Sequence, residues 1–172
     1  ILDMRAANIN TQKTRELSHL CFKHNNDDVL KTAVIYGANA SGKSNIIKAI
    51  RFCHAMVYES HKHNENTVFN FSPFKFSSKK NKPSNYFIRF VSEGIEYTYA
   101  FSLTNTEIVK ESLYYYPQGK KAKVFERDET IKGSKRDKYS FAKSVIKRPF
   151  DVVENTSNKT LFISRASQMD RE

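Results

Sequence analysis

The sequence lacks several features that would define other classes of protein. It has no tryptophan, only two cysteines, and no apolar run near the roughly 18–20 residues that a membrane-spanning helix needs. It also has no signal-peptide pattern. Cys21 and Cys53 are too few for a disulfide framework or a CxxC metal pair, so we interpret them as reduced, partly buried thiols. These absences favour a cytoplasmic protein without a membrane segment, a disulfide scaffold or a zinc module.

The composition is that of a folded, basic protein. Its 172 residues are 39% hydrophobic and include 13 Phe and 9 Tyr, enough to bury a core in one domain or in a large part of one. The net charge is +11, and a basic surface attracts phosphate polyanions, so nucleic acid is a candidate partner. A Lys-rich proteome or an acidic remainder of the protein explains this charge equally well. Because the sequence does not begin with Met and stops directly after an apolar stretch, we expect it to be a fragment.

Two local patterns meet at residues 33–60. Residues 33–36 form a short apolar run that ends at Gly37, which predicts a parallel strand buried on both faces. After Gly42 the apolar residues recur at helical spacing, which predicts a helix that fades near residues 60–64. The predicted apolar stripe consists of Ile46, Ile47, Ile50, Cys53, His54 and Val57. Before this unit, residues 23–28 indicate a polar turn.

Beyond residue 85 the apolar period changes to two. Residues 95–103 alternate strictly between apolar or aromatic and polar or small side chains, the pattern of a half-buried antiparallel strand. Ser92, Glu93 and Gly94 indicate a hairpin turn before it. The predicted meander has strands at 86–91, 95–103, 108–116 and 122–127. A weaker pattern indicates a helix within 139–157, and residues 160–164 indicate one more strand.

Residues 37–44 read Gly-Ala-Asn-Ala-Ser-Gly-Lys-Ser, the complete GxxxxGKS pattern of a phosphate-binding loop. Gly37 lets the chain turn, and Gly42 adopts a backbone conformation that is closed to other residues. The loop amides and the positive end of the following helix then surround a phosphate. Lys43 neutralises charge between the β- and γ-phosphates, and the Ser44 hydroxyl is a magnesium ligand. The motif therefore predicts binding of ATP with Mg²⁺.

The extended form Gly-x-Asn-x-Ser-Gly-Lys-Ser-Asn resembles the ABC-type ATPase heads of the SMC, RecF and OLD group. Residues 36–50 are similar, more narrowly, to the prokaryotic "AAA family ATPase" proteins found among phage-defence and abortive-infection systems. Further similarities are the Ser-Pro-Phe-Lys sequence around Phe74, the hairpin that starts at Gly94, and segments 113–117 and 125–127. The resemblance assigns nucleotide binding to Gly37, Ala38, Asn39, Ala40, Ser41, Gly42, Lys43, Ser44 and Asn45.

The resemblance implies an α/β fold, namely the P-loop lobe of an ABC-type head with a mixed sheet and an antiparallel β-subdomain. Residues 1–60 would supply the P-loop strand and helix, 61–135 the β-subdomain, and 136–172 a return to the core with a candidate Q-loop. Gln168 would then touch magnesium and the attacking water. The alternative is an ordinary surface glutamine beside Arg165.

Other motifs that such an ATPase needs are missing. The sequence has no Walker B strand ending in Asp-Glu, and residues 150–154 are the nearest match but do not fit. The signature motif and the switch histidine are missing too. We therefore interpret the sequence as the N-terminal part of a head without its C-terminal lobe, inactive alone, with hydrolysis in the complete protein. The resemblance also implies a homodimer or higher oligomer through ATPase heads, and control of an effector nuclease or toxin.

The sequence also leaves other functions to consider. A DNA-binding or DNA-repair module of the SMC or RecF kind would use its ATP site for regulation, with the basic loops 119–123 and 132–138 on the phosphate backbone. The aromatic residues 114–116 could stack on bases, although packing within a subdomain is the simpler reading. A third alternative is a plain kinase or GTPase. GTP is disfavoured because no Asn-Lys-x-Asp motif is present, and the antiparallel insertion directly after the first helix argues against a small kinase. The histidines 54, 61 and 63 have no cysteine or carboxylate at metal-ligand spacing.

Overall fold

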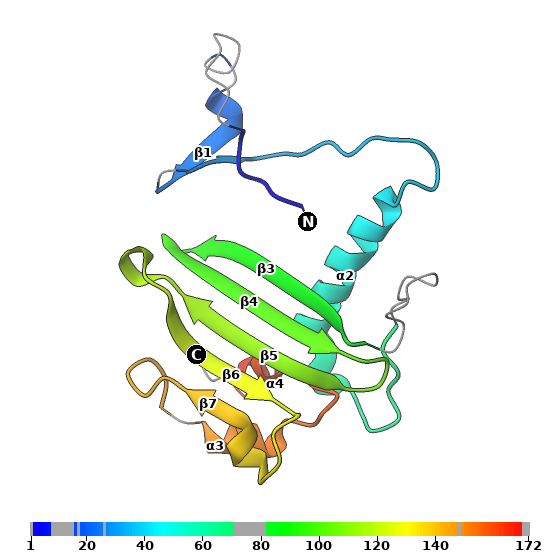
Figure 1. Cartoon of the computed structure of the whole chain (residues 1–172), viewed down its shortest axis with the longest axis vertical. Helices are drawn as coiled ribbons and strands as arrows, with labels where there is room; N and C mark the ends of the chain where they lie inside the picture. The colour runs from blue at the N-terminus through cyan, green and yellow to red at the C-terminus, as the bar shows by residue number, and fades with distance from the viewer. Residues whose placement is uncertain are drawn as a thin grey trace. The chain divides into compact units, whose positions relative to one another are not determined.

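The structure is a computed structural model that describes residues 2–7, 16, 18–25, 27–70, 82–147 and 149–169. The chain divides into two compact units, residues 1–46 and residues 47–172 (Figure 1). Helix α2, Lys43–Glu59, begins in the first unit and continues into the second. The units are described separately below. No helix in the described ranges is long and apolar enough to cross a membrane.

The first unit contains a short hairpin. Strands β1, Cys21–His24, and β2, Asp27–Leu30, pair antiparallel and follow the 3-10 turn η1, Ser18–Leu20. Arg5 adds an isolated bridge to Val29. The polar turn predicted at residues 23–28 is therefore wrong in extent, because Lys23 lies opposite Asp28 in the ladder. Opposite charges on facing strands stabilise such a pair.

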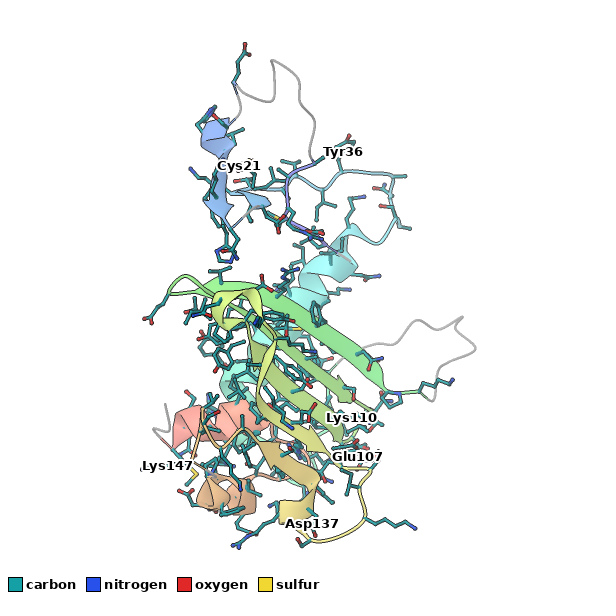
Figure 2. All side chains as sticks on the ribbon, turned by 60° about the vertical axis from the view of Figure 1, so that its left-hand side comes forward. Cys21, Tyr36, Glu107, Lys110, Asp137 and Lys147 are labelled. Atoms are coloured by element: carbon teal, nitrogen blue, oxygen red, sulfur yellow. The ribbon has the colours of Figure 1, made fainter. Side chains whose placement is uncertain are left out.

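Residues 33–36 do not form the predicted strand. Residues 32–37 have no regular structure, and the exposed fractions of Val34 and Tyr36 are 81% and 90%. Figure 2 labels Tyr36 on this segment. A buried parallel strand depends on neighbouring strands and on covering layers at both faces. Among the described residues, no strand pairs with this segment. The mixed sheet is also not formed there, because both observed sheets are antiparallel.

The helix predicted after Gly42 is confirmed. Helix α2 ends at Glu59 and is followed by a 3-10 turn, η2, Ser60–Lys62. The apolar stripe is only partly buried: Ile47 and Ile50 are 54% and 52% exposed. The core contacts come from Phe52, Cys53, Met56 and Val57 in the C-terminal half of the helix. Thus the end of α2 remote from the phosphate loop is the end held by packing.

The second unit is built on a five-stranded antiparallel sheet in the order β3-β4-β5-β6-β7 (Figure 1). Its strands are β3 Ser84–Ser92, β4 Ile95–Leu103, β5 Ile108–Tyr115, β6 Ala122–Asp128 and β7 Tyr139–Phe141. The four predicted strands are confirmed, as is the turn at Glu93 and Gly94, where φ is 52° and 77°. Strand β7 was not predicted, and it occupies the start of the segment expected to be helical.

The C-terminal part of the chain is helical where a strand was predicted. Helix α3 is Phe150–Asn155, so only this part of the predicted 139–157 helix forms. Helix α4 is Phe162–Gln168, and the strand predicted at 160–164 is wrong. The Glu111 carboxylate on β5 accepts hydrogen bonds from the amides of Phe162 and Ile163. This long-range cap favours a helix start over an extended segment.

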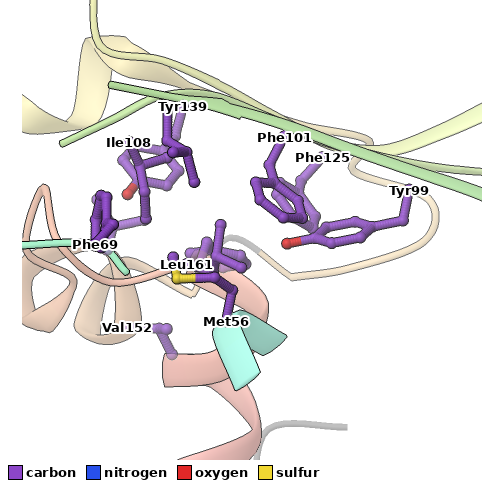
Figure 3. Packing of buried hydrophobic residues seen from close by; sticks show 12 residues of the cluster. Met56, Phe69, Tyr99, Phe101, Ile108, Phe125, Tyr139, Val152 and Leu161 are labelled. Carbon is purple, nitrogen blue, oxygen red and sulfur yellow. The ribbon is translucent and has the colours of Figure 1, made fainter. Parts of the chain in front are cut away.

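One face of the sheet packs against α2, α3 and α4 to form the core (Figure 3). Strands β4, β5 and β6 contribute Tyr99, Phe101, Leu103, Ile108 and Phe125, and the covering elements contribute Met56, Val152, Val153, Leu161 and Phe162. The ring of Phe162 lies 4.8 Å from that of Phe125 and 5.5 Å from that of Tyr139, measured between centroids. Tyr115 stacks on Tyr97 within the sheet, which agrees with a packing role for this residue.

Candidate nucleotide-binding site

The phosphate-binding motif forms a loop that opens helix α2. Gly42, the residue before the helix, has φ of 93°, a conformation that side chains disfavour. Ala40 also has a left-handed backbone, with φ of 63°. The amide of Asn45 donates to the carbonyl of Gly42 at 2.9 Å and starts the hydrogen-bond pattern of the helix. The loop thus turns sharply between an extended segment and a 17-residue helix.

The Lys43 side chain folds back over this loop. Its Nζ donates to the carbonyl oxygens of Gly37 and Ala38 at 2.7 and 2.6 Å and lies 3.5 Å from Oγ of Ser41. The ammonium group is therefore held at the loop by groups within six residues of it. A phosphate at the loop would meet a cation that is already in position.

Three backbone amides of the loop are donors that suit an anion. Among the described residues, the amides of Asn39, Ala40 and Gly42 donate to no protein acceptor. The first amides of a helix lack an intrahelical acceptor and carry the positive end of its dipole. The first turn of α2 has no acidic residue that would compete for them. This donor set fits the phosphate groups of a nucleotide.

The predicted binding residues lie together in one exposed segment. Residues 37–41, Ser44 and Asn45 are exposed, and Gly42 and Lys43 are half-buried. The exposed Ser44 hydroxyl, on the first turn of α2, is the group that would hold a magnesium ion beside the phosphates. The local geometry therefore fits ATP with Mg²⁺ at residues 37–45.

Gln168 is the last residue of α4 and its side chain is exposed. Its Oε1 accepts a hydrogen bond from Nη1 of Arg165 at 2.9 Å, and Nη2 of Arg165 donates to the carbonyl of His61 at 3.1 Å. Gln168 belongs to the unit of residues 47–172 and the loop to the unit of residues 1–46. Its role toward magnesium therefore stays a prediction.

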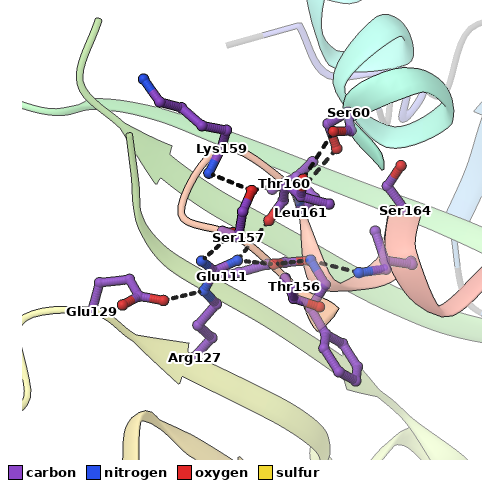
Figure 4. A network of polar contacts seen from close by, with 12 residues as sticks. Ser60, Glu111, Arg127, Glu129, Thr156, Ser157, Lys159, Thr160, Leu161 and Ser164 are labelled. Atoms are coloured by element: carbon purple, nitrogen blue, oxygen red, sulfur yellow. Dashed lines mark hydrogen bonds and ion pairs between the residues drawn. The ribbon is translucent and has the colours of Figure 1, made fainter. Parts of the chain in front are cut away.

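A buried polar cluster that sequence reasoning missed lies between the sheet and α4 (Figure 4). Oε1 of Glu111 accepts from the Tyr99 hydroxyl at 2.9 Å and from the Ile163 amide at 3.1 Å, and Oε2 accepts from the Phe162 amide at 2.6 Å. Nη1 of Arg127 lies 3.7 Å from Oε2. All four neighbours are donors, so the carboxylate is satisfied although it is only 1% exposed.

Arg127 joins this carboxylate to the chain before α4. Its Nη1 and Nη2 donate to the carbonyls of Thr160 and Ser157 at 2.7 and 3.0 Å, and its Nε donates to Oε1 of Glu129 at 2.7 Å. The sequence pattern could have indicated this pair. Glu111 is two residues from Leu113 and Arg127 is two residues from Phe125, so both charged side chains lie on the apolar face of their strands.

The electrostatics of the cluster follow from burial and pairing. Burial raises the pKa of Glu111 above its ordinary value, and Arg127 and the two amides oppose that rise. Burial also acts to raise the pKa of Glu129, but Arg127 and Lys138 more than offset it, so the pKa is lowered. The cluster thus holds one fully buried and one half-buried carboxylate around a single buried guanidinium.

The end of α2 is tied to the same segment. Oγ1 of Thr160 donates to the carbonyl of Ser60, and the amide of Leu161 donates to Oγ of Ser60, both at 3.0 Å. The amide of His61 donates to Oγ of Ser164 at 3.1 Å. The helix that begins at the phosphate loop is therefore anchored, at its other end, to the start of α4.

A GxxxxGKS loop that opens a long helix, with its lysine folded onto the loop, defines a P-loop nucleotide-binding protein. Residues 33–171 match a family model described as "AAA domain, putative AbiEii toxin, Type IV TA system". This match spans most of the chain, and the chain belongs to that family. The family implies a P-loop NTPase fold with ATPase-like function in an abortive-infection or toxin–antitoxin context. No match was found among curated proteins or among solved structures.

Proposed function

We propose that residues 37–45 bind Mg-ATP, and that this chain is part of an ABC- or SMC-like ATPase that gates an effector in prokaryotic defence. The observation that carries the proposal is the position of Lys43, whose ammonium lies 2.6–2.7 Å from two carbonyls of the loop. A cation held in this way already places positive charge at the loop when phosphate arrives.

The residues would divide the work as follows. Amides of the loop and of the first turn of α2 donate to the phosphate oxygens, and Lys43 places its charge between the β- and γ-phosphates. Ser44 offers its hydroxyl to the metal. The metal that Ser44 would hold supplies further positive charge beside the phosphates when bound. These groups act by positioning and electrostatics, so binding is the activity assigned to this segment.

Hydrolysis belongs to the complete protein in this proposal. Gln168 would contact magnesium and the attacking water, and two heads would enclose ATP so that binding closes a dimer and hydrolysis reopens it. That cycle would control a nuclease or toxin. In the complete protein, Gln168→Ala is expected to lower ATP hydrolysis while MgATP binding stays unchanged. Unchanged turnover would remove Gln168 from the site.

Calorimetric titration with MgATP tests the binding assignment. The wild-type chain is expected to bind ATP only with magnesium present, and Lys43→Ala is expected to abolish binding. Lys48→Ala is the matched control, because Lys48 lies on the exposed side of the same helix and its loss changes the net charge equally. Equal affinity in the Lys43 variant would refute the assignment.

A second candidate, regulated DNA binding, is favoured by the net charge of +11 and by the exposed Lys120 and Lys121 beside the β5–β6 turn. Its signature would be an affinity for duplex DNA that falls steeply with salt and does not change in Lys43→Ala. Absence of that salt dependence would leave nucleotide binding as the function of this chain.

A further inference from the structure

The two edges of the five-stranded sheet differ. At one edge, β7 has three residues and follows a basic 3-10 turn, η4, Lys135–Lys138. At the other edge, β3 has nine residues and pairs with β4 in nine consecutive positions without a bulge. No other strand in the described ranges pairs with β3. Proteins usually protect a long edge with bulges, lysines or proline, and β3 has none of these within its length.

The side chains of β3 are also unusually apolar for an edge. Phe87, Phe90 and Val91 are 67%, 40% and 42% exposed. The only charged residue of the strand is Arg89, and Nη2 of Arg89 is bound to Oε2 of Glu96 at 2.7 Å. A row of backbone donors and acceptors flanked by apolar side chains is a surface for adding another strand.

We propose that this edge pairs with β3 of a second copy of the chain, antiparallel and centred on Ile88, so that the two sheets join into one. This register pairs all nine residues of β3 and keeps the core faces on the same side. A centre at Arg89 would place two arginines opposite each other, which is destabilising. A centre at Phe87 would place Val91 opposite Pro83, which has no amide to donate.

On the core face, the register continues an existing row of rings. Phe90 already stacks on Tyr97 and Tyr86 on Phe101, with centroids 5.4 and 4.9 Å apart. Across the new edge, Phe90 would lie opposite Tyr86 of the second copy, and Ile88 would lie opposite itself. Aromatic and β-branched pairs of this kind stabilise antiparallel neighbours.

On the opposite face, the register keeps like charges apart. Arg89 would lie opposite Phe87 of the second copy, where a guanidinium is attracted to the ring. Just beyond the strand, Pro83 would lie opposite Glu93 of the second copy, so that carboxylate would face an uncharged residue. The two-fold symmetry makes each of these contacts occur twice, and no like charges face each other.

Sedimentation equilibrium of the chain without nucleotide, from about 1 to about 100 μM, tests this interface. The expected result is a reversible dimer. Phe87→Lys should give a monomer, because each new lysine would face Arg89 of the other copy. Phe87→Glu should keep the dimer, because it removes the same ring but faces that arginine with a carboxylate. Both variants change an exposed side chain, and circular dichroism would verify their fold.

Lys43→Ala should also remain dimeric, which separates this interface from any association driven by ATP and makes its failure distinguishable from failure of the proposed function. Alternate β3 amides are already bonded to β4, so hydrogen exchange should show the remaining, edge-facing β3 amides protected in the dimer and exposed in Phe87→Lys. A monomer throughout the range would overturn the proposal, as would equal behaviour of the two Phe87 variants. A monomer with protected edge-facing β3 amides would assign the edge to a segment of the same chain and would overturn it too.

Discussion

The phosphate loop and the polar cluster around Glu111 and Arg127 place charges in opposite ways. Lys43 is held by partners two to six residues away, in a segment whose residues are mostly exposed. Glu111 and Arg127 are almost fully buried, and their hydrogen-bond partners in the α4 segment lie 30 to 52 residues away. The loop is therefore open to a ligand, whereas the cluster is buried and joins the sheet to the segment before α4.

Removal of Arg127 should produce the largest effect. Arg127→Ala leaves the Glu111 carboxylate buried without its cation, removes the donor to the Thr160 carbonyl, and leaves the Ser157 carbonyl with only the Thr160 amide. Breaking a buried pair in this way costs about 3–5 kcal/mol of the free energy of unfolding, measurable by urea denaturation. Lys110→Ala is the control, because its ion pair with Asp128 is exposed and should contribute below about 1 kcal/mol. Similar losses of unfolding free energy in both variants would contradict the distinction between the buried cluster and exposed ion pairs.

Cys53, on the helix that connects the two regions, gives a pH-dependent test of burial. Burial raises the pKa of the Cys53 thiol from 9.0 to about 11. Because only the thiolate reacts, native labelling by a disulfide reagent at pH 8 should be about 100-fold slower than in the unfolded chain, and should accelerate as pH rises toward 11. The measurement uses a Cys21→Ser background. Equal rates before and after unfolding would show that this part of α2 is not packed.

The smallest effect is expected at the loop itself. Gly42→Ala meets no heavy atom within 4 Å of the added Cβ, but its φ of 93° costs a side chain roughly 1–2 kcal/mol. Because the exposed loop can relax in the free chain, this cost should appear on binding: MgATP affinity should fall about tenfold, with the unfolding midpoint nearly unchanged. Gly119→Ala is the matched control, with φ of 76° and equally open space in the β5–β6 turn. A loss of affinity in both variants would mean that the effect is not local.

The same contrast explains what sequence could predict. The loop, the start of α2 and the four long strands depend on local spacing, on glycine at one backbone position and on an alternation of period two. The helix at 162–168 could not be read in this way. Its cap is a carboxylate 51 residues earlier, and the run of residues 160–164 is as apolar as a strand. Tertiary contacts overrode local propensity there.

The strand prediction at residues 33–36 was wrong for a related reason. Its apolar composition describes the burial that it would have beside neighbouring strands, and no such strand occurs in the described part of the chain. At the site, the motif was sufficient to group residues 37–45, but nothing in the local sequence could show that Arg165 holds Gln168 and the carbonyl of His61. That contact links positions more than 100 residues apart.

The hydrogen bonds between Ser60 and the start of α4 also determine when, during synthesis, the end of α2 can be anchored. The two hydrogen bonds made by Thr160 and Leu161 join positions 100 and 101 residues apart. At the usual rate of elongation, roughly 5–20 s would pass between the appearance of the phosphate-loop helix and that of the segment that anchors it. The helix that carries Lys43 is thus synthesised well before the residues that anchor its C-terminal end. A nascent chain would contain the phosphate-binding motif before this helix could be held in place.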